Sequence, residues 1–305
     1  MQRKSNTEYI LSLSYGKDSL ACLEAIRLLG YPLDRVVHAE VWATDTIPAD
    51  LPPMVDFKAY ADKQIKERYG ITVEHICAMR NGEKLTYEKL FYHIPKRKSI
   101  SDESNLWQGL PNGFPLLKGS YCKKLKINAI GGWAKKGRYC EATGQLKTYP
   151  FKDFCKSCSQ SLQDTTNKTV IQYLGIAADE PERIIRHTAQ GKVLPLVDIG
   201  WSEERCRKWC EDNNLLSPIY TTATRGGCWF CHNQSIEQLR LLRKSYPDLW
   251  LLLLKWDLDS PIPFHPDGHT VHDFEKRFEL EDKGLVPTDR KFRWKMLNFE
   301  NRSLV

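Results

Sequence analysis

The stretch ILSLSYGKDSLACLEAIRLLG, residues 10–30, defines how the fold begins. Its first apolar residues predict a buried strand, and its second half repeats apolar residues at helical spacing, at Leu20, Leu23, Ile26 and Leu29. Between the two patterns lies SYGKDS, a polar turn that contains one glycine. We therefore expect a strand, a tight turn and a helix in direct succession near the start of the chain.

Further strand and helix patterns follow this first unit. The segments RVVHAEVW (35–42) and ITVEHICA (71–78) predict strands, with a helix over 54–70 between them. The order of strand and then helix returns in KTVIQYLGIAADEPERIIRH, residues 168–187. Strands separated by helices pair in parallel through right-handed crossovers. The chain is therefore predicted to be an α/β protein with a doubly wound parallel sheet, which binds ligands at the carboxyl ends of its strands.

The remaining segments indicate how the chain is divided. Residues 1–235 are predicted to form the α/β domain, with a mobile loop at 92–119 and a cysteine-containing insertion at 137–168. Helical patterns dominate 236–305, which we expect to be a helical C-terminal extension. The longest apolar run, LWLLLLKW, is too short to span a bilayer, and the N-terminus shows no apolar signal segment. We expect a cytoplasmic protein without a membrane partner.

The positive charge of the chain is concentrated in one region. The net charge is +7, and residues 80–138 alone contain 13 lysines and arginines against 4 acidic residues, an excess of +9. Such a patch suits a polyanion, either the phosphates of a nucleotide or a nucleic-acid backbone. The alternative is a solvated loop and helix face rich in lysine.

The SYGKDS turn has the residue types of an anion site. A turn between a strand and a helix presents backbone N–H groups and the positive end of the helix dipole to one point. Gly16 permits a tight backbone there. Ser14 and Ser19 add hydroxyl donors, and Lys17 adds a charge suited to phosphate. Asp18 would repel the same anion unless it caps the helix or meets a divalent cation that bridges to phosphate oxygens. The turn therefore predicts a site for a nucleotide with Mg²⁺, although it matches neither G-x-x-x-x-G-K-S/T nor G-x-G-x-x-G.

The ten cysteines favour metal ligation or reduced thiols over disulfides, because nothing in the sequence indicates secretion. Two Cys-x-x-Cys pairs, Cys155 with Cys158 and Cys228 with Cys231, are typical of metal or redox sites. An iron–sulfur cluster, a zinc ion and free structural thiols all stay open as interpretations. Four other cysteines are interpreted as thiols of the core: Cys22, Cys77, Cys206 and Cys210.

The same turn resembles a known family signature. SYGKDS is similar to the S-G-G-K-D-S motif of the PP-loop ATP pyrophosphatase superfamily, with Tyr15 in place of a glycine. Four later segments resemble the branch related to phosphoadenosine phosphosulfate (PAPS) reductase: HAEVWATDT (38–46), YCKKLKI (121–127), YLGIAADEPERI (173–184) and RGGCWFCHNQ (225–234). The resemblance covers residues 8–235. It implies a Rossmann-like fold of the adenine nucleotide alpha hydrolase type.

Members of this superfamily cleave ATP between the α and β phosphates, usually to adenylate a substrate. The resemblance implies a nucleotide cradle formed by the whole turn: Ser14, Tyr15, Gly16, Lys17, Asp18 and Ser19. Three of these residues, Lys17, Asp18 and Ser19, are the implied catalytic group, with ATP and Mg²⁺ as the cofactors. Adenylation would activate the substrate for a second nucleophile such as a sulfur donor or an amine. A nucleotide, a nucleic acid and a sulfur-donor protein are the partners that this reaction suggests.

Three residues outside the turn belong to the same expectation. Thr44 and Asp45, at the tip of the second predicted strand, are expected close to the nucleotide. A simple turn role is the alternative for Asp45. Arg183, which follows a later strand, can pair with a phosphate or lie on a solvated helix face.

Two other functions compete with the pyrophosphatase. A sulfonucleotide reductase, acting on PAPS or adenylylsulfate, would bind its substrate in the same cradle and attack it with a cysteine near the C-terminus. The last cysteine here is Cys231, and the Lys17–Asp18 pair is intact, so both features favour an ATP-splitting relative. The third possibility is a non-catalytic nucleotide-binding subunit of a larger system.

The resemblance also bears on the cysteines. In adenylylsulfate-reducing relatives, a [4Fe-4S] cluster is held by a Cys-Cys pair and a later Cys-x-x-Cys. Cys122, Cys228 and Cys231 resemble three of these ligands, and Tyr121 stands where the other would be. The implied metal site is therefore either a [4Fe-4S] cluster completed from the insertion, or a separate Zn²⁺ site in it, with these candidate donors: Cys140, Cys155 and Cys158.

Overall fold

The computed structural model describes residues 1–94, 110–115, 169–220, 227–265 and 267–301. These residues form two compact units. The first contains the described residues up to 87 and between 169 and 228, and the second contains the others. The division thus falls at Cys228, before the predicted boundary at residue 235, and it assigns the chain just after Tyr87 to the second unit.

Part of the predicted organisation lies outside the described residues. The predicted insertion at 137–168 lies outside the described residues, and the same holds for four predicted metal-ligand candidates: Cys122, Cys140, Cys155 and Cys158. The predicted mobile loop at 92–119 is described only at 92–94 and 110–115. These predictions remain predictions.

The first unit is built on a parallel sheet of four strands in the order β3-β2-β1-β6. The bounds of the strands are Thr7–Ser12 for β1, Arg35–Glu40 for β2, Val73–Cys77 for β3 and Thr169–Leu174 for β6. The alternation of strand and helix patterns is confirmed, and the fold is α/β. The chain moves outward from β1 to β3 and returns to β6 on the other side of β1. The carboxyl ends of β1 and β6 therefore form the point where the topology switches, which is where such sheets bind ligands.

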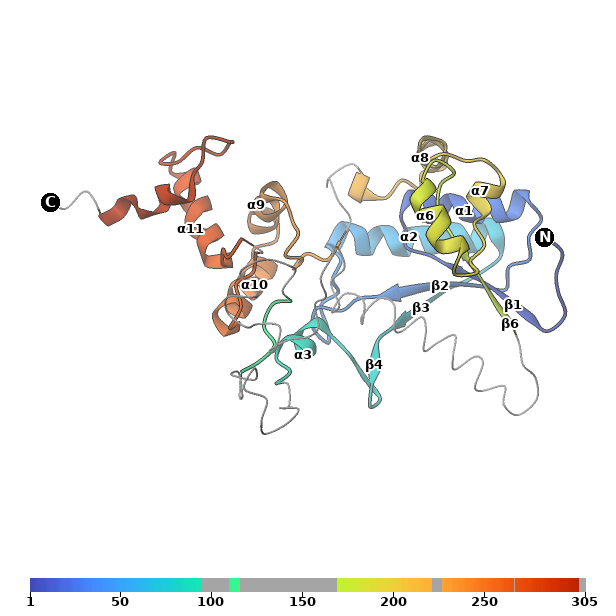
Figure 1. Cartoon of the computed structure of the whole chain (residues 1–305), viewed down its shortest axis with the longest axis horizontal. Coiled ribbons are helices and arrows are strands. Elements are labelled where there is room, and N and C mark those ends of the chain that lie inside the picture. The colour runs from blue at the N-terminus through green and yellow to red at the C-terminus, as the bar shows by residue number, and fades with distance from the viewer. Residues whose placement is uncertain (95–109, 116–168, 221–226, 266, 302–305) are drawn as a thin grey trace. The chain divides into compact units, whose positions relative to one another are not determined.

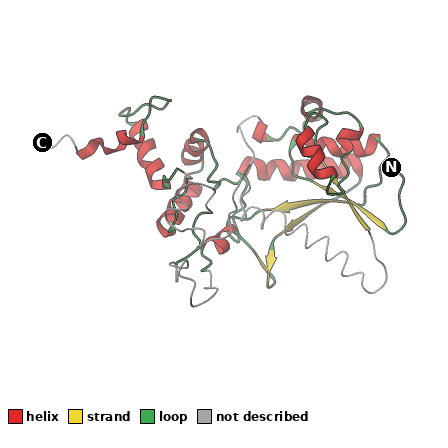
Figure 2. Ribbon diagram, viewed as in Figure 1, coloured by secondary structure: helices red, strands yellow, loops and turns green. Residues whose placement is uncertain are grey.

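The helices described in the first unit lie on one side of this sheet (Figures 1 and 2). Their bounds are Lys17–Leu28 for α1, Pro52–Tyr69 for α2, Pro181–Thr188 for α6, Pro195–Asp198 for α7 and Glu203–Asp212 for α8. Helix α1 packs against α7 and α8, and it buries the predicted apolar positions Leu20, Leu23 and Ile26. Pro181 occupies the first turn of α6, where the N–H that proline lacks would have no partner in any helix.

Four cysteines were predicted to be thiols of the core, and this prediction is confirmed for three of them and wrong for one. Cys22, Cys206 and Cys210 are fully buried in the core between α1 and α8. Cys77 ends β3 and is only half-buried, with its thiol 3.6 Å from the sulfur of Met79.

A small hairpin follows β3 and was not predicted. Strands β4 (Met79–Arg80) and β5 (Glu83–Lys84) pair in antiparallel fashion. The two residues between them, Asn81 and Gly82, both have positive φ angles, 53° and 83°. An Asn-Gly pair with this backbone is the preferred two-residue connection of a hairpin. The Asn81–Gly82 dipeptide was therefore the sequence signal from which the hairpin could have been predicted.

The second unit is mainly helical, in agreement with the predicted C-terminal extension. Its helices are α3 (Tyr87–Phe91, which begins at the end of the first unit), α9 (Ile236–Ser245), α10 (Pro247–Asp259) and α11 (Val271–Asp282), followed by a 3-10 helix over Trp294–Asn301. The long helical pattern after Ser235 proves to be two helices, because Pro247 cannot continue α9 and instead begins α10. Ser235 and Thr270 each cap the following helix in a capping box.

An aromatic cluster forms the interior of the second unit. Phe91 stacks on Trp256 with ring centroids 5.9 Å apart, and Phe114 meets Phe91 and Phe264 edge to face at 5.2 and 5.1 Å. Phe114 is fully buried and Asn112 almost so. Residues 112–114 of the predicted mobile loop are therefore part of a packed core. None of the helices in the described part of the chain combines the length and the apolar composition that a membrane crossing needs.

Candidate active site

The β1–α1 turn folds around the hydroxyl of Ser19. This oxygen accepts hydrogen bonds from the Ser14 N–H at 3.1 Å and from the Ser14 hydroxyl at 3.0 Å, and it donates to the Gly16 carbonyl at 3.0 Å. Gly16 precedes the first residue of α1 and has no side chain to cap it. A Cβ at Gly16 would lie 3.3 Å from the Tyr220 hydroxyl, so lateral space, not a positive φ, favours glycine here. The turn therefore leaves the N-terminal amides of α1 at the carboxyl end of β1.

Tyr15 turns away from this cradle and into the core. Its φ is +57°, an uncommon conformation for a bulky residue, and its side chain is fully buried. The Tyr15 hydroxyl donates to Asp62 and lies 3.1 Å from Nε2 of His75. Burial and the Asp62 carboxylate raise the pKa of Tyr15, so the phenol remains neutral. Tyr15, predicted to bind the cofactor, thus holds the turn in place from behind.

Lys17 and Asp18 pair with each other at the start of α1. The Lys17 ammonium lies 2.8 Å from Oδ1 of Asp18 and 3.5 Å from Oε1 of Glu203, and only 9% of Lys17 is exposed. Burial opposes the charge of Lys17, but the two carboxylates outweigh it and raise its pKa. Burial raises the pKa of Asp18, and Lys17 counteracts this shift. The ammonium is therefore held charged among carboxylates.

Three carboxylates converge beside Lys17. Oxygen atoms of Asp18, Glu180 and Glu203 all lie within 4.8 Å of one another. They come from α1, from the residue before α6 and from the first turn of α8, so three separate segments meet at this point. Hard oxygen donors at this spacing suit Mg²⁺ by donor type. The sequence analysis selected only Asp18, because nothing in the sequence shows that α8 returns to the β1–α1 turn.

Gly175 makes this approach of the segments possible. It follows β6, and a Cβ there would lie 2.5 Å from the carbonyl oxygen of Asp18 and 2.6 Å from Cα of Ser19. No L side chain fits at that distance from backbone atoms. The end of β6 can therefore touch the start of α1 only through a glycine. The sequence analysis missed Gly175, although a glycine directly after a predicted strand was a usable signal.

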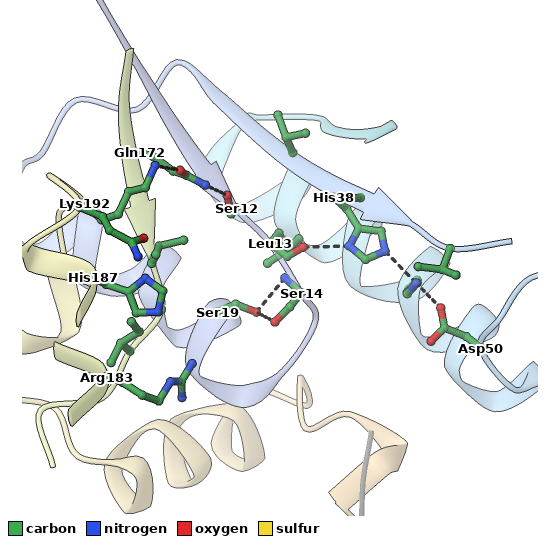
Figure 3. Close-up of a pocket in the computed structure, with 18 of the residues that line it drawn as sticks. Ser12, Leu13, Ser14, Ser19, His38, Asp50, Gln172, Arg183, His187 and Lys192 are labelled. Atoms are coloured by element: carbon green, nitrogen blue, oxygen red, sulfur yellow. Dashed lines mark hydrogen bonds and ion pairs between the residues drawn. The ribbon is translucent and has the colours of Figure 1, made fainter. Parts of the chain in front are cut away.

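A cavity of about 670 Å³ opens at the carboxyl ends of β1, β2 and β6 (Figure 3). Of the predicted site residues, Ser14, Ser19, Arg183 and Cys228 line it. The other predicted members of the turn are absent from its lining, as are Thr44 and Asp45. The hydroxyl side of the cradle therefore faces the cavity, while Lys17 faces the carboxylates.

Thr44 and Asp45 lie in a tight turn after β2. The Thr44 hydroxyl accepts hydrogen bonds from the N–H groups of Thr46 and Ile47, at 3.3 and 3.0 Å. Asp45 is exposed, and its backbone carbonyl accepts a hydrogen bond from Lys84 at 3.3 Å. These contacts correspond to the turn alternative for Asp45.

The β2–α2 side of the cavity carries a polar chain that the sequence analysis missed. Nδ1 of His38 lies 2.8 Å from the carbonyl of Leu13, and Nε2 lies 2.8 Å from the Lys58 ammonium, which also contacts Asp50 at 2.6 Å. Burial, and then the charge of Lys58, lower the pKa of His38 to about 4. A neutral imidazole with the proton on Nδ1 fits these partners, because it donates to Leu13 and accepts from Lys58. These hydrogen bonds connect α2 to Leu13, the residue that lies between β1 and the turn.

Two of the predicted cysteine ligands are described. Cys228 is buried, and Cys231 is half-buried. Among the described residues, the acidic group of Asp18, Glu180 and Glu203 is the only cluster of three or more possible metal ligands. A cysteine metal site therefore remains a prediction, since the other proposed ligands lie outside the described ranges.

Comparisons with known proteins add little to this site. No known family matches the sequence, and no curated protein matches it either. A search of solved structures finds, among others, the U34-tRNA thiolase NcsA from Methanococcus maripaludis with its [4Fe-4S] cluster. The two chains share 12% identity and a TM-score of 0.31, over 95% of this chain and 76% of that one. A likeness at this level supports no conclusion about this chain, so its chemistry rests on its own residues.

Proposed function

We propose that the protein is an ATP pyrophosphatase that adenylates an acceptor molecule. The observation that carries this proposal is the placement of a charged, buried Lys17 beside three carboxylates, next to the hydroxyl-lined turn at the end of β1. A divalent cation would balance the negative charge of the carboxylates, and a phosphate chain would bind to Lys17 and the turn. The resemblance of SYGKDS to the PP-loop signature supports the same reading.

The backbone at Tyr15 gives the resemblance a physical basis. The motif has a glycine where this chain has Tyr15, and Tyr15 has a positive φ of 57°. Glycine adopts that conformation readily, whereas other residues need compensation. In this chain, the bonds of the Tyr15 hydroxyl to Asp62 and His75 provide it. The turn thus keeps the backbone shape that a glycine-containing motif would have.

The residues of the turn would divide the work on ATP. The α1 amides and the hydroxyls of Ser14 and Ser19 would bind phosphate oxygens, and Lys17 would stabilise the negative charge that develops on the departing pyrophosphate. Asp18, Glu180 and Glu203 would hold Mg²⁺, which supplies charge neutralisation at phosphate oxygens when it is bound. Their donor type and spacing fit that ion.

The reaction that follows is a substitution at the α phosphorus. A nucleophilic atom of the acceptor forms a bond to this phosphorus, the bond to the oxygen that bridges the α and β phosphates breaks, and pyrophosphate leaves with that electron pair. The proton of the acceptor passes to water. The adenylated acceptor is then open to attack by a second nucleophile, such as a sulfur donor, which would release AMP.

Binding of a non-cleavable nucleotide tests the proposal. Titration calorimetry with α,β-methylene-ATP should show binding that requires Mg²⁺ and that weakens by about 30-fold or more in Lys17→Ala. Lys63→Ala is the matched control, because Lys63 is an exposed lysine on α2, and it should leave the affinity unchanged. Absence of binding to the wild-type protein, or equal binding by Lys17→Ala, would refute the proposed site.

A further inference from the structure

The α6 side of the cavity presents three nitrogen-bearing side chains. Arg183 and His187 lie one turn apart on α6, and Lys192 follows the helix; all three line the cavity (Figure 3). Residues four apart on a helix share a face, so Arg183 and His187 point the same way. Arg186, on the same helix, does not line the cavity.

His187 contains a buried polar atom without a partner. Its Nδ1 is shielded from solvent and makes no hydrogen bond within the described part of the chain. A buried polar atom without a partner is unfavourable unless a ligand or water pairs with it. Burial lowers the pKa of His187, and the charges of Arg186, Arg183 and Lys192 lower it further. His187 therefore lies among three positive charges, and its Nδ1 has no hydrogen-bond partner among the described residues.

We call the side of the cavity formed by Arg183, His187 and Lys192 the wall. The contacts of its side chains show how it could accept an anion. Lys192 donates to the side chain of Gln172, whose own amide donates to Ser12 on β1, so the lysine is anchored to the sheet. Arg183 is paired with Glu180, which is one of the three clustered carboxylates. A cation held by that cluster would compete with Arg183 for Glu180 and leave the guanidinium available to an anion.

We propose that Arg183, His187 and Lys192 form a second anion site, which binds a phosphate group of the acceptor. The proposal rests on the proposed function, because it assigns ATP to the turn and the acceptor to this wall. Phosphate suits these donors, because arginine and lysine both bind it; a terminal phosphate ester offers three strong acceptor oxygens, and the phosphodiester of a strand offers two. The acceptor would then be a phosphate ester, present either in a free nucleotide or in a nucleic-acid strand.

The test uses the full chain saturated with Mg²⁺ and α,β-methylene-ATP, so that the turn is already occupied. This complex is titrated with inorganic phosphate, with UMP and with a single-stranded oligouridylate. We expect UMP or the oligouridylate to bind, and Lys192→Ala to weaken that binding by about tenfold. Arg186→Ala removes the same charge from the same region and should change the affinity by less than about twofold. NMR signals of the His187 ring should shift when a phosphate probe binds to the wild-type protein.

Two arms distinguish the sources of the phosphate. If a strand is the acceptor, the oligouridylate binds more tightly than UMP, and Lys192→Ala reduces the slope of log affinity against log salt by about one unit. If a free nucleotide is the acceptor, UMP binds as tightly as the oligouridylate. Lys192→Ala then changes the slope of log affinity against log salt equally for the two probes. Either pattern supports the second site.

Three results would overturn it. The saturated protein could bind none of the probes, Arg186→Ala could weaken binding as much as Lys192→Ala does, or Lys192→Ala could weaken the ATP analogue as much as the probes. The last result would assign the wall to ATP itself. If the wild-type protein fails to bind the analogue, the proposed function fails instead, and titration of the ligand-free protein with the same probes still tests the wall.

Discussion

The first unit buries two lysines to almost the same degree, and they differ in what surrounds them. Lys17 is 9% exposed and Lys58 is 8% exposed. Lys58 has one carboxylate, Asp50, and one neutral imidazole, His38, so its charge is balanced within the protein. Lys17 contacts two carboxylates, Asp18 and Glu203, of a cluster of three, and Arg183 pairs with the third, Glu180. The cluster therefore keeps an excess of negative charge that a divalent cation would balance.

This difference distinguishes Lys58, which supports the fold, from Lys17, which is proposed to act on a ligand. The Lys58 chain ends on the carbonyl of Leu13 and holds the strand that leads into the turn. Lys17 begins the helix at the carboxyl end of β1, where ligands of α/β sheets bind. Burial alone therefore does not mark a functional lysine, whereas an unbalanced charge environment does.

The largest effect is expected from Lys17→Ala, which removes the lysine proposed to bind the phosphates of ATP. We expect the rate of ATP cleavage to fall by about 10³-fold, because the developing charge on pyrophosphate loses its main cationic partner. Pyrophosphate release, measured with a coupled assay, is the readout, and Lys63→Ala should retain the wild-type rate. If Lys17→Ala kept more than about a tenth of the wild-type rate, Lys17 would only support the fold, and the prediction would be wrong.

Gly175→Ala tests the placement of α1 against β6 without touching either lysine. A Cβ 2.5 Å from the Asp18 carbonyl oxygen would force the start of α1 to move, at a cost of about 3 kcal/mol in the free energy of unfolding. Gly227→Ala is the control, since nothing lies within 4 Å of its Cβ position. Urea unfolding measures both variants. Equal stability of the two would mean that the close approach of β6 and α1 is not strained by a methyl group.

Lys58→Met should destabilise the fold by about 2 kcal/mol, because it leaves the Asp50 carboxylate and Nε2 of His38 without their partner. The value is below that of a fully buried pair, since 30% of the Asp50 side chain is exposed. Thermal unfolding of Lys58→Met and of the double variant with Asp50→Asn checks this: the second substitution should recover part of the loss. A larger loss in the double variant would argue against a balanced pair.

The smallest effect concerns pH and the support behind Tyr15. Hydrogen bonds to Asp62, and then to Glu40, raise the pKa of His75 to about 9. Because this pKa exceeds the unfolded value of about 6.5, the stability from His75 is fully present below pH 6.5 and is lost as pH rises through about 9. Unfolding free energies measured from pH 6 to 10 should therefore fall more steeply for the wild-type protein than for His75→Gln. Parallel curves would contradict the assignment.

The sequence allowed the local elements to be predicted, because each depends on neighbours in the chain. The pattern around SYGKDS predicted β1, the turn and α1. The residues that complete the site come from distant segments. Glu203 reaches Asp18 only because α8 packs on α1, and the role of Gly175 follows from β6 pairing beside β1.

The directions of the side chains within the turn also could not be predicted from the sequence. Ser14 lines the cavity, whereas the positive φ of Tyr15 sends the ring of the next residue into the core instead of toward a ligand. His38 and Lys58 form a pair across 20 positions of sequence, and no local pattern connects them. Tertiary packing determines each of these contacts.

The identity of the products of ATP tests the central claim most directly. The wild-type protein is incubated with Mg²⁺, with ATP labelled in the α phosphate and with an RNA extract as a source of acceptors, and the products are separated. The account predicts pyrophosphate in equal amount to the sum of AMP and adenylated acceptor, with product formed about 10³-fold more slowly by Lys17→Ala. Formation of ADP and inorganic phosphate alone would contradict it.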